Sequence, residues 1–114
     1  MILPAIAAAS AVLIAAGGSV QITEAQLEAA HYGRILGAAA QCSSIDRHRV
    51  SDATHHASLA VRALVSSSQQ FEAARGSFDN AALDGRAGVS QGQESCAAAD
   101  HDLKEIEIKF GGGK

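Results

Sequence analysis

The sequence has almost no proline and almost no strand-like pattern. Pro4 is the only proline in the 114 residues, and apolar and polar residues alternate only in the short run EIEIKF at 105–110. Proline breaks helix interiors, and alternation is the pattern of half-buried strands, so both absences favour helices. We therefore predict an all-α fold: a small antiparallel three- or four-helix bundle that follows an N-terminal hydrophobic segment and is held by one disulfide.

Signatures of catalysis and of cofactor binding are also missing. The sequence has no C-x-x-C pair and no G-x-S-x-G motif, so it lacks a thioredoxin-like dithiol and a nucleophile elbow. The glycines of GRAGVSQG (85–92) do not follow a strand, as those of a phosphate-binding loop would. In Asp100-His101-Asp102, adjacent helical residues would point about 100° apart, so they cannot all serve one site. We predict no enzyme activity and no cofactor.

A concentrated basic surface is absent as well. Nine Lys and Arg residues stand against twelve Asp and Glu residues, giving a formal net charge of −3, and the two signs are interleaved. Nucleic-acid binding requires basic residues gathered on one face. The expected partner is therefore a protein or a small molecule and not a nucleic acid. A membrane is expected as a partner only if the N-terminal segment is retained, and the oligomeric state is left open.

The N-terminal segment carries no charge before Glu24, and residues 1–16 are almost all apolar. A membrane-spanning helix needs roughly 20 such residues, whereas a secretory signal has about 7–15, followed by a small-x-small cleavage site. Residues 15–17 or 17–19 would supply that site, although no Lys or Arg precedes the apolar block. We predict that residues 1–19 are a cleaved signal peptide and that the protein is periplasmic or secreted. The alternatives are an uncleaved anchor in the inner membrane and a buried helix of a cytosolic protein.

Residues 20–110 are predicted to form one helical domain, and residues 111–114 (GGGK) a flexible tail. Large apolar residues are few, and small domains with thin cores usually need a covalent staple. Two cysteines in an exported chain are expected to pair, which predicts a Cys42–Cys96 disulfide. A closed loop of about 54 residues would stabilise the fold by ~4 kcal/mol. The alternatives are two separate buried thiols and a bridge between two chains.

The first helix has a sequence signal at each end. Thr23 and Gln26 have the spacing of a capping box, and Cys42 is expected to close the helix. Gly33 and Gly37, four residues apart, mark either weak points or a face that another backbone approaches closely. The buried stripe of this helix is predicted to comprise Leu27, His31, Ile35, Ala38 and Cys42.

Three further segments are predicted from spacing and composition. Apolar steps of three and four over residues 50–78 predict one long helix or two nearly collinear helices, with a kink at the serines 66–68. Residues 77–88 (SFDNAALDGRAG) are predicted to be a turn region because they are rich in Asp, Asn and Gly. A seven-residue apolar repeat over residues 89–110 predicts a final helix.

The histidines suggest one candidate metal site. His48, Asp52 and either His55 or His56 would share a helix face at i, i+4 and i+7 or i+8. Two imidazoles and a carboxylate are suitable ligands for a divalent metal, although the flanking arginines add positive charge. The alternatives are a solvated polar face and a histidine cluster that becomes charged as the pH falls through about 6.5.

His31 and Tyr32 form a second candidate site. Tyr32 is the only tyrosine, and His31 takes an apolar position in the expected buried stripe. The pair either lies at the edge of the domain or lines a small polar pocket between helices, where bundles often hold ligands.

The sequence supports two main functional hypotheses from different classes, and a third, weaker one. The first is an exported, non-catalytic binding or accessory module of the bacterial periplasm or cell envelope. The alternative is a membrane-anchored structural protein whose heptad-like helices pair with another chain, and weak divalent-metal binding comes third. A signal, helices and two separated cysteines form a layout similar to that of small helical proteins of bacterial envelopes, but no motif is specific to one family.

Overall fold

The computed structural model describes residues 22–111, and these residues form four helices and no strands. The helices are α2 (Glu24–Gln41), α3 (Arg47–Arg62), α4 (Ser68–Ser90) and α5 (Cys96–Lys109). The predicted all-α bundle is confirmed. The predicted signal peptide lies outside the described residues, as does the end of the predicted tail.

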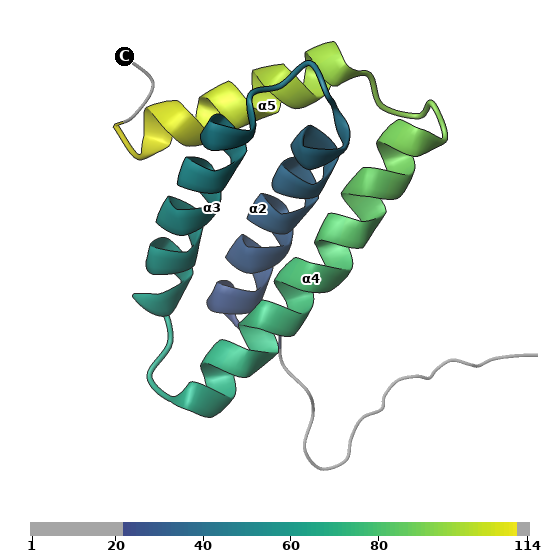
Figure 1. Ribbon diagram of the computed structural model, residues 1–114. Helices are drawn as coiled ribbons and strands as arrows, with labels where there is room; N and C mark the ends of the chain where they lie inside the picture. The colour runs from purple at the N-terminus through teal and green to yellow at the C-terminus, as the bar shows by residue number, and fades with distance from the viewer. Residues whose placement is uncertain (1–21, 112–114) are drawn as a thin grey trace, which may run out of the picture.

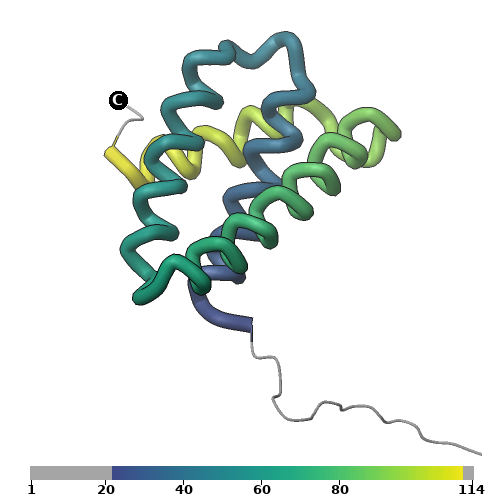
Figure 2. Tube along the Cα trace, turned by 60° about the horizontal axis from the view of Figure 1, so that its bottom comes forward, coloured from purple at the N-terminus to yellow at the C-terminus, as the bar shows by residue number. Residues whose placement is uncertain are grey.

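Helix α2 is the centre of the bundle. It lies between α3 and α4 (Figure 1), while α5 runs across α2 and α3, as Figure 2 also shows. Its predicted capping box is present: the backbone N–H of Gln26 donates to Thr23 Oγ1 at 3.2 Å, and the N–H of Thr23 donates to Gln26 Oε1 at 3.0 Å. Both bonds satisfy donors that a helix start would otherwise leave without partners.

Helices α2 and α4 pack with their backbones in close contact. A Cβ atom at Gly33 would collide with the backbone of Phe78, and one at Gly37 would lie 2.6 Å from the Cα of Ala82. Gly85 on α4 likewise leaves room for the backbone of α2, because its Cβ would lie 2.9 Å from the amide nitrogen of Ala38. Of the two interpretations of Gly33 and Gly37, close approach is therefore the right one. The two helices run in the same direction, since residue numbers rise together along the contact.

The predicted buried stripe of α2 is wrong at its first two positions. Leu27 is 61% exposed, and His31 is exposed as well. Helix α2 faces α4 with Gly33 and Gly37, where the two backbones are in contact. The side chain of Leu27 lies on another face of α2 and is exposed. The buried residues of α2 are Ala25, Ala29, Tyr32, Gly33, Ile35, Leu36, Gly37, Ala38 and Ala39.

The prediction of one long or nearly collinear helix over residues 50–78 is wrong. Helix α3 ends at Arg62, and α4 starts at Ser68 and runs back in the opposite direction (Figure 1). The serines expected to kink a helix instead begin one: the N–H of Gln70 donates to Ser67 Oγ at 3.1 Å, and the N–H of Ser66 donates to Gln70 Oε1 at 2.8 Å. Serine is a strong N-cap, and here it starts a new helix.

The expected turn at residues 77–88 is also wrong, because this segment is part of α4. Gly85 and Gly88 are buried, Gly85 against the α2 backbone and Gly88 beside Glu94, and this packing outweighs their low helix propensity. The real break comes after Ser90, so the continuous helix predicted over residues 89–110 is wrong as well. Gly92 has φ of +77°, and the N–H of Gln93 donates to the Gly88 carbonyl at 2.8 Å, which closes the end of α4.

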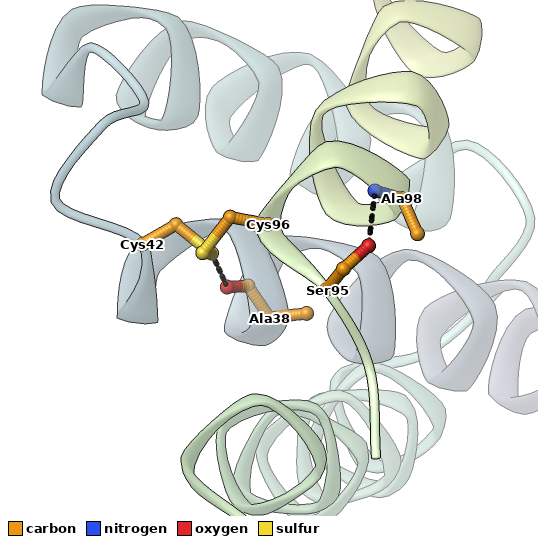
Figure 3. The surroundings of a disulfide bond; sticks show 5 residues. All are labelled: Ala38, Cys42, Ser95, Cys96 and Ala98. Atoms are coloured by element: carbon orange, nitrogen blue, oxygen red, sulfur yellow. Dashed lines mark hydrogen bonds between the residues drawn. A yellow bond between two sulfur atoms is a disulfide. The ribbon is translucent and has the colours of Figure 1, made fainter. Parts of the chain in front are cut away.

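The Cys42–Cys96 disulfide joins the first and last of the described helices. Cys42 caps the C-terminus of α2 and Cys96 is the first residue of α5, with their Cα atoms 5.7 Å apart (Figure 3). The Ser95 hydroxyl caps α5 beside it by accepting a bond of 3.0 Å from the N–H of Ala98. The predicted disulfide is confirmed, and α5 is fixed across the end of α2.

The core is thin and rich in alanine. Leu103 is the largest side chain that is completely buried, and Ala99 and Ile106 complete the buried face of α5. Within residues 22–111, no helix combines the length and the apolar character needed to cross a membrane.

Candidate functional site

An ion-pair network attaches α3 to α5. The guanidinium of Arg49 donates to both carboxylate oxygens of Glu107, from Nε and Nη2 at 2.9 Å each, and from Nη1 to Asp100 Oδ1 at 2.7 Å. These bonds raise the pKa of Arg49, and the bond from Arg49 is the main reason why the pKa of Asp100 lies below its ordinary value of 3.8. The network ties the first turn of α3 to α5.

Helices α3 and α4 meet each other only weakly because α2 lies between them, and a hollow lies between the two helices. We call it the α3–α4 groove. It has a volume of about 350 Å³, which lies in the range of small-molecule sites. Its walls come from α3 and α4 and its floor includes a residue of α2; the lining residues are Ala29, Thr54, Ser58, Val61, Arg62, Phe71, Ala74, Arg75, Phe78 and Asp79.

The floor of the α3–α4 groove is apolar. Ala29, Val61 and Ala74 are buried, with exposed fractions of 1%, 4% and 0%. Phe71 and Phe78 are half-buried and stand along the α4 wall. Two partly exposed aromatic rings above small buried side chains offer a concave apolar surface to a ligand.

The rim carries charge that the protein itself leaves unpaired. Arg62, Arg75 and Asp79 are exposed, and no ion pair within residues 22–111 involves any of them. The Cζ atom of Arg62 lies 4.4 Å from the centroid of the Phe71 ring, a cation–π contact that holds the guanidinium at the mouth of the groove. Two guanidinium groups therefore outnumber one carboxylate at this rim.

A second hollow, of about 630 Å³, lies at the other end of α3 beside Cys42. Half of the residues that line it are polar, among them Gln41, Arg47 and Arg86. The α3–α4 groove has the same share of polar lining residues, and the difference lies in its two phenylalanines, because the second hollow has no aromatic side chain. We therefore take the α3–α4 groove as the candidate site.

The predicted metal ligands lie on the exposed surface of α3. His48, Asp52, His55 and His56 are all exposed, and the rings of the last two lie 5.9 Å apart between centroids. Within residues 22–111, no three His, Cys, Asp or Glu side chains are grouped so that they could hold a metal ion. Metal binding stays a prediction, which calorimetric titration with zinc, copper and nickel tests.

The structure separates His31 and Tyr32, the two residues of the second candidate site. Tyr32 is buried and its ring packs against Phe110, 5.7 Å away between centroids, while His31 is exposed. The Nζ atom of Lys109 lies 5.2 Å from the centroid of the Tyr32 ring, so this tyrosine joins α2 to the end of α5. Neither hollow is lined by His31 or Tyr32.

The triplet Asp100-His101-Asp102 is likewise divided. Asp100 pairs with Arg49, whereas His101 Nε2 lies 3.4 Å from Glu105 Oε2 one turn further along α5. Asp100 and His101 therefore contact different residues.

Sequence reasoning missed the α3–α4 groove. Its walls belong to the segment whose spacing predicts one long helix or two nearly collinear ones, and a groove between two helices exists only once they fold back as a hairpin. The available signal was the run of serines, which can cap a helix as well as bend one.

Neither a protein-family model nor a curated protein nor a solved structure matches this chain.

Proposed function

We propose that this protein is an exported, disulfide-stapled helical module that acts by binding a ligand and not by catalysis. The α3–α4 groove is its binding surface, and the periplasm or the extracellular space is its compartment. The observation that carries this proposal is the concave apolar floor of the groove beneath exposed, unpaired charges. Ligand sites in helical bundles combine an apolar surface with a few polar groups in this way.

Export is supported by two independent features. The apolar segment 1–19 ends in small residues and has the length of a secretory signal. The Cys42–Cys96 disulfide persists in an oxidising compartment and is rare in a reducing one.

The alternative, pairing with another chain through heptad-like helices, would require side chains that lie inside the bundle. Of the repeat over residues 89–110, Ala99, Leu103 and Ile106 are buried inside the bundle, and the helix is interrupted between Ser90 and Cys96. These side chains are not available to a second chain.

The binding proposal is tested with a neutral apolar dye, Nile red, whose fluorescence rises when it enters an apolar site. Ser58 is exposed and lines the groove, so Ser58→Trp fills the groove without disturbing the core. Leu59→Trp is the matched control, because Leu59 is 51% exposed on the same helix and does not line the groove. We expect the first variant to abolish the fluorescence rise and the second to retain it. Equal dye binding by both variants would contradict the proposal.

Export is tested by the intact mass of the protein recovered from the producing cell. Loss of about 18 or 19 residues is the expected result for a secretory signal. Retention of Met1 in a membrane fraction would exclude cleavage.

A further inference from the structure

We infer that the α3–α4 groove takes a fatty acid, a single apolar chain with a carboxylate head. This inference rests on the proposed function, because it names the ligand class of the same groove. It follows from the distribution of charge along the groove and from the shape of its floor.

The floor suits one unbranched apolar chain. Ala29 and Ala74 at its base are 1% and 0% exposed, so the apolar surface that a ligand can touch comes mainly from the half-buried Phe71 and Phe78. Phe71 and Phe78 stand two helical turns apart on the α4 wall, roughly 10 Å along the axis, and are half-buried. An alkyl chain lying between them would cover the faces that the protein leaves open.

The rim favours an anionic head. The protein has a formal net charge of −3, yet two of the three charged residues at the rim are arginines. Guanidinium groups present N–H donors in a planar fork that matches a carboxylate. Neither Arg62 nor Arg75 forms an ion pair within residues 22–111, so a ligand carboxylate would not have to displace an acidic side chain of this chain from either guanidinium group.

The charges also give the ligand a direction. Arg62 is the last residue of α3 and lies over Phe71 in the first turn of α4, so the positive end of the groove is next to the hairpin loop. Asp79 lies eight residues beyond Phe71, which is roughly 12 Å along the axis of α4, and one turn beyond Arg75. A carboxylate beside Asp79 would be repelled, so the head belongs at Arg62, on the loop side of Arg75, and the tail runs past Ala74 toward Phe78.

The inference is tested by isothermal titration calorimetry on the purified full chain, whose N-terminus is defined by intact mass. The two probes are dodecanoate and dodecyltrimethylammonium, each used below its critical micelle concentration. The two probes have the same tail and opposite head charges. We expect dodecanoate to bind at least tenfold more tightly and to weaken as salt is added. Arg62→Gln and Arg75→Gln should each weaken dodecanoate roughly fivefold to tenfold. Arg47→Gln, at the other end of α3, should leave its affinity unchanged, and circular dichroism confirms that each variant is folded.

The outcomes separate this inference from the proposed function. Equal affinity for the two probes, with Ser58→Trp abolishing both, overturns the fatty-acid assignment and leaves the groove as an apolar site for another occupant, such as the apolar face of a partner helix. Dodecanoate binding that responds to neither arginine variant also overturns it. Binding that persists in Ser58→Trp overturns the proposed function as well.

Discussion

Gly37 of α2 and Ala82 of α4 are in backbone contact, so that a Cβ atom at position 37 would lie 2.6 Å from the Ala82 Cα. This contact lets α4 lie directly on α2, whose Ala29 forms part of the floor of the α3–α4 groove. A bundle with so few large side chains gains stability from such close approach, because many weak dispersion contacts add up.

Gly37→Ala is expected to lower the free energy of unfolding by about 1–3 kcal/mol, since neither backbone can move away cheaply. The matched control is Gly76→Ala in α4, where a Cβ would meet nothing within 4 Å. Alanine there should raise stability by about 0.5–1 kcal/mol through helix propensity. Thermal and urea unfolding measure both variants, and a stabilised Gly37→Ala protein would show that the helices are not in contact at this point.

The double variant Cys42→Ala/Cys96→Ala is expected to lose up to ~4 kcal/mol, because the cross-link closes a long loop in the unfolded chain. The test is urea unfolding of this variant beside the oxidised parent protein. Mass analysis should find the non-reduced monomer two hydrogens lighter than the reduced one. Free alkylation of either cysteine in the protein as purified would contradict the disulfide.

Arg49→Met is expected to lower stability by about 1 kcal/mol at neutral pH, because it removes the bidentate pair with Glu107 and the bond to Asp100. Arg47→Met is the control: Arg47 is exposed and forms no ion pair within residues 22–111.

The effect of Arg49 should also depend on pH. Asp100 has a folded-state pKa below its ordinary value of 3.8, so its contribution is complete above that pH and is lost as the pH falls through the lowered value. The stability difference between the parent and Arg49→Met should therefore shrink in acid. A difference that stays constant down to pH 2 would show that Asp100 takes no part.

Local signals in the sequence predicted the parts of this fold that depend on neighbouring residues. The capping box of Thr23 and Gln26 gave the start of α2, and the absence of proline after Pro4 gave the helical class. The disulfide followed from the expected compartment and from the presence of only two cysteines.

The parts that depend on tertiary packing could not be predicted in the same way. The glycines at positions 85 and 88 indicated a turn, but both are buried within α4, where Gly85 meets the backbone of α2. Leu27 was expected to be buried because it is large and in register, yet the contact is made by glycine and alanine. The groove depends on the direction in which α4 leaves the hairpin, which no local pattern encodes.

The most direct test of the account is to locate bound dodecanoate on the isotopically labelled protein by NMR. We expect the changes in amide chemical shift to concentrate at Ala29, Val61, Ala74 and Phe78. Ala99 and Leu103 in α5 should change little. Shifts centred on α5, or none at a dodecanoate concentration that saturates binding in calorimetry, would contradict the α3–α4 groove as the binding site.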